Sequence, residues 1–226
     1  MHRLRAVGIR VAIDHSDATY NQAKTGFAAG VSFATHLFNA MSPLVSREPE
    51  DHRRPVRGPE IYCNIISDGL HVNRANVRNA KRIKGDHLVL VIDVTASTGA
   101  ENIDRFIFAS ETIYYRHDLC TDGRGTFSGS ALTMIEVAHN NVEYAGIALD
   151  EALRMAALYP AQAIGVDARL GTLTVGKIAN LSTFIPAIIK SAKLSFTAKK
   201  FGHERVSDDT ERTDPDRQAI LTLLNN

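Results

Sequence analysis

Four short apolar segments in the first hundred residues each end in polar side chains that could do chemistry. The polar residues are Asp14, His15 and Ser16 after the first segment, Thr35 and His36 after the second, Ser67, Asp68 and His71 after the third, and Asp93 after the fourth. The carboxyl ends of parallel strands face one common mouth, where α/β barrels and open α/β sheets place their active sites. We therefore expect these side chains to share one site.

His15 and His36 are the candidate metal ligands. Neutral imidazole binds Zn²⁺ and other divalent transition metals, and two ligands at strand ends can converge on one ion. A single histidine at a strand end is more often a hydrogen-bonded structural residue. The spacing alone therefore leaves both interpretations open.

Asp93 ends the most strand-like segment of the chain, His87–Ile92. A carboxylate there costs free energy unless it is paired, metal-bound or catalytic. Beside a metal-bound water it could accept a proton and return it to a leaving amine. The alternative is a helix N-cap in the following turn.

Arg47 and His71 are candidates for binding an anion, because a guanidinium fork suits phosphate and histidine can donate a hydrogen bond. The Asn39 amide could hold a sugar hydroxyl, and the segment 125–129 (GTFSG) could present backbone groups to a ligand. The structural alternatives are a solvated loop arginine, a turn asparagine and a turn leading into a helix.

Alternating strands and helices are the main pattern of the chain. Segments rich in apolar and β-branched residues predict strands at Val7–Ile13, Val31–Leu37, Ile61–Ser67 and His87–Ile92. Helical spacing predicts helices at Ala18–Ala29, Arg74–Lys84, Ser130–Tyr144 and Leu149–Leu158. Hairpins are expected between Asp93 and Gly129, and turn and strand residues over Leu170–Lys177. This alternation predicts an α/β fold with a parallel sheet.

Composition excludes several classes of protein. The chain has 226 residues, 44% hydrophobic and 23% charged, which is ordinary for a globular protein. A net charge of +1 gives no electrostatic case for nucleic acid or an anionic membrane as a partner. Cys63 and Cys120 are expected to be reduced structural thiols. Without a membrane-length apolar run or a signal-peptide pattern, the sequence predicts a cytoplasmic protein.

Several motifs together resemble the N-acetylglucosamine-6-phosphate deacetylase family. In family order they are HSDATY at 15–20, THLFNAMS at 35–42, REP at 47–49, DGLHV at 68–72, LVLVIDVT at 88–95 and TFSGSALTM at 126–134. The second, third and last are specific motifs. The resemblance covers about residues 5–185.

The resemblance implies the C-terminal half of a TIM (β/α) barrel of the metal-dependent amidohydrolase type, with a remnant of a small β-sandwich. The expected divisions are residues 5–165 for the partial barrel, 166–200 for the β-sandwich remnant and 201–226 for a divergent, poorly ordered tail. A four-strand piece of a closed barrel exposes two sheet edges, so we expect a homo-oligomer.

The implied reaction is hydrolysis of the acetamide of N-acetylglucosamine 6-phosphate, giving glucosamine 6-phosphate and acetate. His15 and His36 would bind a divalent metal, with zinc favoured and iron or another metal as alternatives. Asp93 would be the general base and then the general acid. The residues expected to bind the sugar phosphate are Asn39, Ala40, Arg47, Asp68, His71, Thr126, Phe127 and Ser128, with Arg47 and His71 on the phosphate.

The sequence also departs from the family pattern. The family's third metal ligand is an upstream Glu that this chain lacks, and Asp14 stands where the family has Gly. Residues 50–58 (EDHRRPVRG) replace a small, apolar stretch. We therefore expect weak or absent activity from this chain alone. The alternatives are another metal-dependent amidohydrolase, an inactive pseudo-enzyme that binds sugar phosphate or pairs with another subunit, and a decayed protein without function.

Overall fold

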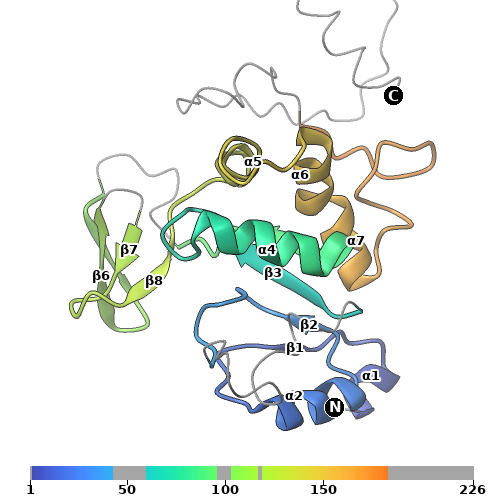
Figure 1. Cartoon of the computed structure of the whole chain (residues 1–226), viewed down its shortest axis with the longest axis horizontal. Helices are drawn as coiled ribbons and strands as arrows, with labels where there is room; N and C mark the ends of the chain where they lie inside the picture. Colours follow the sequence, from blue (N-terminus) through green and yellow to red (C-terminus); the bar gives the residue numbers. More distant parts are fainter. Residues whose placement is uncertain (1, 43–59, 96–102, 117–118, 183–226) are drawn as a thin grey trace, which may run out of the picture. The chain divides into compact units, whose positions relative to one another are not determined.

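The computed structural model describes residues 2–42, 60–95, 103–116 and 119–182 (Figure 1). The chain divides into two compact units, Met1–Ile178 and Ala179–Asn226. All the helices and strands described below belong to the first unit.

A four-stranded parallel sheet carries the polar strand ends. Its strands are β1 (Ala12–Ile13), β2 (Phe33–Ala34), β3 (Tyr62–Ile66) and β4 (Leu88–Val91), and they lie side by side in chain order. Every neighbouring pair is parallel. The predicted parallel α/β sheet is therefore confirmed, and the shared direction of its strands brings the four carboxyl ends to one edge.

Helices with clear sequence signals connect and cover these strands. Helix α2 (Tyr20–Ala28) lies between β1 and β2, and α4 (Arg74–Lys84) lies between β3 and β4. Helix α4 begins after Asn73, whose side chain accepts a hydrogen bond from the Ala75 amide, and ends at Gly85. Its bounds match the sequence prediction, because a polar cap and a C-terminal glycine mark both ends. A 3₁₀ turn, η1 (Gly85–His87), leads into β4.

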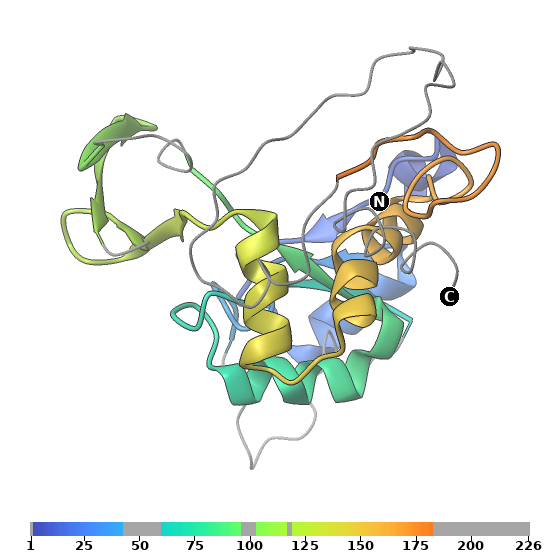
Figure 2. The ribbon, with the colours of Figure 1, turned by 90° about the horizontal axis from the view of Figure 1, so that it is seen from above.

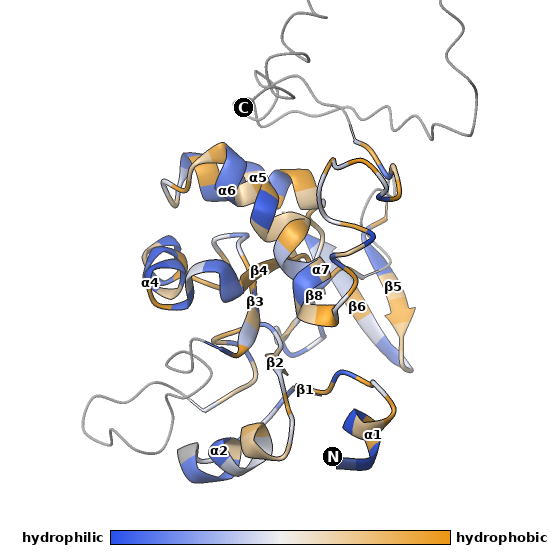
Figure 3. Cartoon of the chain, turned by 90° about the vertical axis from the view of Figure 1, so that its right-hand side faces the viewer, coloured by the Kyte–Doolittle hydropathy of each residue, from blue (hydrophilic) through white to orange (hydrophobic). Residues whose placement is uncertain are grey.

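The core lies between β3, β4 and the later helices. These helices are α5 (Met134–Glu143), α6 (Leu149–Ala156) and α7 (Leu158–Ile164). Together with α4 they gather beside β3 and β4 (Figure 2), and α5 and α6 carry both apolar and polar sides (Figure 3). The buried apolar residues include Cys63, Ile65, Val77, Leu88, Leu90, Val137, Ala152 and Met155. Removal of these side chains from water is the main stabilising contribution to the fold.

A separate antiparallel sheet is inserted between β4 and α5. It contains β5 (Arg105–Phe108), β6 (Glu111–Arg116), β7 (Leu119–Thr121) and β8 (Phe127–Ser130), in that order. Each neighbouring pair is antiparallel, which confirms the hairpins expected in this segment.

The structure corrects several predicted boundaries. Residues His2–Ala6 form helix α1, and the amides of Val7, Gly8 and Ile9 close the turn after it. The strand predicted at Val7–Ile13 shortens to two residues, and the strand at Val31–Leu37 shortens likewise. Strand length depends on backbone pairing, and β1 pairs with β2 only at Ala12↔Phe33 and Ile13↔Ala34. These predictions were too long because apolar side chains do not reveal where pairing stops.

Helix α7 was not predicted as a separate helix. Pro160 stands in its first turn, where a missing N–H removes no intrahelical hydrogen bond, so this proline does not prevent the helix. Leu170–Lys177 forms turns rather than a strand, with backbone hydrogen bonds from the Lys177 amide to the Thr174 carbonyl and from the Ile178 amide to the Arg169 carbonyl.

The remaining domain predictions are not tested. Residues 166–182 form turns and irregular structure, whereas 183–226 lie outside the described residues, so the β-sandwich remnant and the tail stay predictions. Cys63 and Cys120 are buried thiols, as expected. No helix in the described part of the chain is long and apolar enough to cross a membrane.

Candidate metal and substrate site

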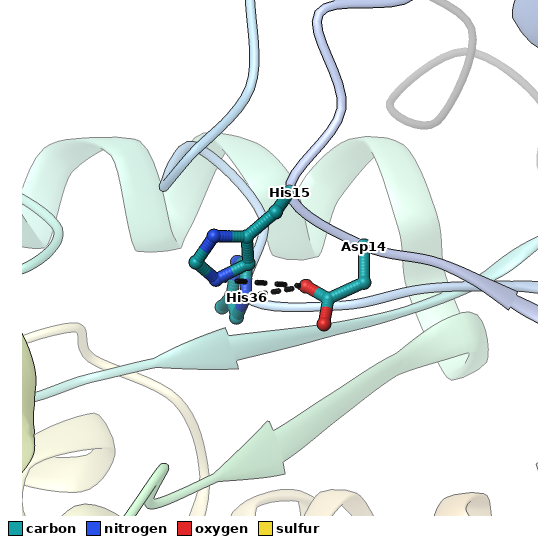
Figure 4. Close-up of side chains that lie close together, drawn as sticks. All are labelled: Asp14, His15 and His36. Carbon is teal, nitrogen blue, oxygen red and sulfur yellow. Dashed lines mark ion pairs between the residues drawn. The ribbon is translucent and has the colours of Figure 1, made fainter. Parts of the chain in front are cut away.

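Asp14, His15 and His36 come together where β1 and β2 end (Figure 4). The Asp14 Oδ1 atom lies 2.7 Å from His36 Nε2 and 3.9 Å from His15 Nε2. The two imidazole rings meet edge to face, with their centroids 4.9 Å apart. The convergence predicted for His15 and His36 is therefore present in the structure, and Asp14 adds a carboxylate to it.

Thr35 holds the Asp14 carboxylate. Its hydroxyl donates a hydrogen bond of 2.5 Å to Asp14 Oδ1. This hydrogen bond lowers the pKa of Asp14 below its usual value; burial opposes the shift, and the nearby His36 and His15 rings favour it. Asp14 is therefore ionised at neutral pH, the form in which a carboxylate binds cations.

His36 is held from three directions. Its backbone amide donates to the side-chain oxygen of Asn64 on β3, and the following Leu37 amide donates to the Asn64 carbonyl at 2.8 Å. Its ring Nδ1 lies 3.2 Å from the Asn39 carbonyl oxygen. Because a carbonyl oxygen only accepts, Nδ1 carries a proton and donates to it, and Nε2 is directed toward Asp14.

The two candidate metal ligands and the candidate catalytic residue have left-handed backbone conformations. The φ angles are 39° at His15, 25° at His36 and 45° at Asp93. This region is unfavourable for residues with a Cβ atom and costs of order 1–3 kcal/mol at each position. Such strain persists where the surrounding structure imposes it, and it concentrates at functional sites. Here it occurs after β1, β2 and β4.

Contacts between the two loops that follow β1 and β2 keep the histidines together. Ser16 and Met41 form an isolated parallel β-bridge. The Ser42 hydroxyl donates to the Asp17 carboxylate at 2.7 Å. The two segments are therefore joined on both sides of the histidine pair. The β1–β2 strand pairing precedes the histidines, and these loop contacts follow them.

The Asp93 residue is exposed, and its backbone is held by residues at the end of β8. The Ser130 amide donates to the Asp93 carbonyl at 2.9 Å, and the Ser130 hydroxyl donates to the Ile92 carbonyl. Gly129 has φ of +90°, and a Cβ there would lie 2.6 Å from the Asp93 carbonyl oxygen. Glycine is therefore required for this close approach. Asp93 follows β4, and β3 separates β4 from β2, a distance of about 10 Å across the sheet.

Asp68 and His71 form a buried pair after β3. The His71 Nδ1 atom is hydrogen-bonded to Asp68 Oδ2, and the two side chains are only 4% and 2% exposed. Asp68 Oδ1 also accepts from the backbone amides of Leu70 and His71, at 2.8 and 2.7 Å. Burial raises the pKa of Asp68, but the hydrogen bonds from His71 outweigh it and the net shift is downward.

Phe127 connects this pair with the antiparallel sheet. Its ring meets His71 edge to face, with centroids 4.9 Å apart. The turn before it is organised by Asp122, whose Oδ1 accepts from the Arg124 and Thr126 amides, each at 2.8 Å. The structure thus brings together three residues predicted to bind substrate: Asp68, His71 and Phe127.

The other predicted substrate residues in the described part of the chain lie on the loop after β2 and on or next to β8. Asn39 and Ala40 follow His36, with Ala40 exposed and at φ of 46°. Thr126 is exposed, and Ser128 lies on β8. Arg47 lies outside the described residues.

The sequence interpretation placed Asp14 and Thr35 among the polar strand ends but assigned them no role, and it missed Asn64. Asp14 and Thr35 adjoin the predicted ligands in the sequence, which was a usable signal. Asn64 is a polar residue within an apolar strand, and its role appears only when β2 and β3 are paired.

The three side chains suit a divalent transition metal. Their ligand atoms all lie within 4.8 Å of one another. Two imidazole nitrogens and a carboxylate oxygen form a donor set used by zinc and non-haem iron. Ligand atoms around a tetrahedral zinc with bonds of about 2.0–2.1 Å are about 3.3 Å apart. The distances from Asp14 Oδ1 to His36 Nε2 and to His15 Nε2, 2.7 and 3.9 Å, lie on either side of that value. Small side-chain rotations would therefore let these atoms bind one ion.

Comparisons with known proteins show which enzymes this chain resembles. N-acetylglucosamine-6-phosphate deacetylase of Haemophilus influenzae is 48% identical over 180 residues, which are 79% of this chain and 47% of that protein. N-acetylgalactosamine-6-phosphate deacetylase of Escherichia coli O157:H7 is 30% identical over 181 residues, 80% of this chain and 48% of that protein. The chain thus spans about half the length of the relatives it matches.

The solved structures that resemble this chain include deacetylases of the same kind. The crystal structure of N-acetylglucosamine-6-phosphate deacetylase from Pasteurella multocida matches with a TM-score of 0.76 and 49% identity, over 79% of this chain and 47% of that one. A mutant deacetylase from Mycobacterium smegmatis, in complex with N-acetyl-D-glucosamine-6-phosphate, matches with a TM-score of 0.72 and 29% identity, over 79% and 48% of the two chains. The model of the amidohydrolase family matches residues 3–204. The chain therefore belongs to the amidohydrolase family.

Proposed function

We propose that this chain carries the metal-binding and catalytic part of an enzyme that hydrolyses the acetamide of N-acetylglucosamine 6-phosphate. The observation that carries the proposal is the meeting of His15 and His36 with a carboxylate at the ends of adjacent parallel strands. The relatives and solved structures named above support this substrate, because those with the highest identities are N-acetylglucosamine-6-phosphate deacetylases.

His15 and His36 would hold a divalent ion, with zinc favoured and iron as an alternative. When bound, such an ion polarises the acetamide carbonyl and makes water more acidic. Asp93 would accept the proton of the attacking water and deliver it to the leaving amine as the C–N bond breaks. The products are acetate and glucosamine 6-phosphate. The hydrogen bonds from Ser130 to the Asp93 and Ile92 carbonyls would hold the Asp93 backbone in place for both transfers.

The sugar phosphate would lie near His71 and Phe127. Because Asp68 occupies His71 Nδ1, Nε2 remains as the ring nitrogen for the ligand. The Phe127 ring supplies an apolar surface next to it. Arg47 keeps its predicted role on the phosphate, and Asn39 and Ala40 keep theirs on the sugar. Thr126 and Ser128 complete the proposed set, next to Phe127 in the chain.

The fold that supports this function is a partial barrel. The parallel strand order β1-β2-β3-β4 is that of consecutive strands in a (β/α) barrel, which leaves β1 and β4 as the outer strands. The remaining barrel wall would come from elsewhere, for example from a second copy, so a homo-oligomer stays our expectation. Low turnover by the isolated chain and a cytoplasmic location are part of the same proposal.

Deacetylation of the galactosamine 6-phosphate analogue is the second candidate. It is favoured by the relative from Escherichia coli O157:H7, whose name gives that substrate. The two sugars differ at one hydroxyl group, so a comparison of the turnover rates on the two substrates separates these functions.

The test is the release of acetate from the purified chain loaded with Zn²⁺ or Fe²⁺. The substrates are N-acetylglucosamine 6-phosphate, its galactosamine analogue and unphosphorylated N-acetylglucosamine. We expect slow release of acetate from N-acetylglucosamine 6-phosphate. The rate should fall about 10²-fold or more in Asp93→Asn and stay unchanged in the surface variant Asp104→Asn. Equal rates with and without phosphate, or rates unaffected by Asp93→Asn, would contradict the proposal.

A further inference from the structure

We propose that Asp14 is a direct metal ligand, so that the ends of β1 and β2 alone form a two-histidine, one-carboxylate site. This inference rests on the proposed function in one respect, namely that His15 and His36 bind the ion. It adds that the third protein ligand comes from the same short segment as the first. No carboxylate from another part of the enzyme is then required.

The position of the carboxylate is the first argument. Asp14 Oδ1 approaches both histidines through Nε2, at 2.7 Å for His36 and 3.9 Å for His15. Asp14 and His15 are 56% and 72% exposed at the side chain, whereas His36 is nearly buried. An ion from solvent can therefore reach the exposed pair, while the buried ring holds its position.

The donor and acceptor chemistry is the second argument. If His36 Nδ1 donates to the Asn39 carbonyl, Nε2 of the neutral ring carries a lone pair. An ionised carboxylate is an acceptor only. Asp14 Oδ1 and His36 Nε2, 2.7 Å apart, are close enough to bind one ion as neighbouring ligands. His15 Nε2, 3.9 Å from the same Asp14 oxygen, adds a second nitrogen to this set.

Support from the surrounding residues is the third argument. Thr35 donates to Asp14 Oδ1, Asn39 accepts from His36, and Asn64 accepts from the His36 backbone. Hydrogen bonds of this kind orient metal ligands and fix the histidine tautomer. The left-handed φ angles of 39° and 25° at the two histidines show that their backbone is held in unfavourable conformations.

The ligand set also predicts the metal. Two nitrogens and one oxygen suit zinc, iron(II), cobalt(II) or nickel(II), whereas calcium and magnesium prefer oxygen ligands throughout. Three protein ligands leave at least one coordination position open, as in catalytic zinc sites. The site would therefore bind cobalt(II), which can be followed by its visible absorption.

The experiment titrates the purified full chain with Co²⁺ and follows visible absorption, with Zn²⁺ competition to measure affinity. The variants are Asp14→Asn, Asp14→Cys, His36→Ala and the surface control Asp104→Asn, each first checked for wild-type circular dichroism. We expect one ion per wild-type chain and an affinity loss of about 100-fold or more in Asp14→Asn, beyond the 10–100-fold typical of a residue that only supports a ligand. Asp14→Cys should add a thiolate-to-cobalt charge-transfer band, which appears only if residue 14 contacts the metal.

The outcomes separate this inference from the proposed function. Binding that is lost in His36→Ala but normal in Asp14→Asn, without the charge-transfer band in Asp14→Cys, overturns the inference and leaves the histidine site intact. No binding by any form of the chain overturns both. Loss of affinity in Asp14→Asn together with the new band in Asp14→Cys supports the inference, and the Asp14→Cys spectrum remains decisive if Asp14→Asn does not fold.

Discussion

The two halves of the parallel sheet differ in how they are stabilised. Strands β3 and β4 have five and four residues, and three residues of each are buried, whereas β1 and β2 have two residues each and little core of their own. The candidate metal ligands lie on the weakly packed half, and Asp68, His71 and Asp93 lie on the well-packed half. The weakly packed half therefore depends on polar contacts, through Thr35, Asn64 and the Ser16–Met41 bridge, to hold its functional residues.

Core truncation should show the largest difference between the halves. Ile65 on β3 is fully buried, so Ile65→Ala should lower the free energy of unfolding by about 2–5 kcal/mol. Ile13 on β1 is only partly buried, and Ile13→Ala should cost about 1 kcal/mol. Urea unfolding followed by circular dichroism measures both. Equal losses of unfolding free energy would contradict the division into a well-packed and a weakly packed half.

A glycine substitution tests how the well-packed half holds Asp93. Gly129→Ala forces a Cβ to within 2.6 Å of the Asp93 carbonyl oxygen at a φ of +90°. We expect a loss of about 2 kcal/mol or more in unfolding free energy, together with a fall in any turnover that depends on Asp93. Gly123→Ala is the control, because nothing lies within 4 Å of its added Cβ. Similar stability for the two variants would rule out the close approach.

The Asp68–His71 pair should make stability depend on pH. The pKa of Asp68 is lower in the folded chain than the ordinary value of 3.8, so its ionised form stabilises the fold above that value. This contribution is lost as the pH falls through the lowered folded pKa. Asp68→Asn should therefore destabilise the chain by about 2 kcal/mol at pH 7, and the difference from wild type should shrink below about pH 4.

Chemical unfolding at a series of pH values measures this effect. A difference that stays constant down to pH 2 would mean that Asp68 is not held ionised by His71. Glu143→Gln, at an exposed position, is the control and should show little change across the range.

The smallest expected stability changes are those at two helix N-caps of the same kind, one on α2 and one on α5. Thr19 and Thr133 both form capping boxes, with Gln22 at the start of α2 and Glu136 at the start of α5. Thr133→Ala should lower the free energy of unfolding by about 1 kcal/mol. Thr19→Ala should cost less in global unfolding and instead increase local amide exchange in α2, because that helix contributes little to the core. Hydrogen exchange distinguishes the two responses.

The sequence predicted the well-packed half better than the weak half. The bounds predicted for the strand at His87–Ile92 and for the helix at Arg74–Lys84 are nearly correct, because local pattern and tertiary packing agree there. The short strands β1 and β2 were predicted too long, because their ends are set by pairing partners and loop contacts rather than by side-chain type.

The candidate site was predicted in part for the same reason. His15 and His36 could be identified from their positions after apolar segments, and the structure brings them together. The sequence placed Asp14 at the same strand end, but its contact with His36 depends on the direction of its side chain and on Thr35 across the strand pair. The pairing of Asp68 with His71 likewise depends on a local turn in which Asp68 accepts two backbone amides.

Metal content of the purified chain tests the central claim most directly. After incubation with Zn²⁺ and gel filtration, elemental analysis should find one zinc per wild-type chain and almost none in the double variant His15→Ala, His36→Ala. Circular dichroism must show that the double variant is folded. Zinc that is absent from the wild type, or retained equally by the double variant, would contradict the assignment of the strand ends of β1 and β2 as the metal site.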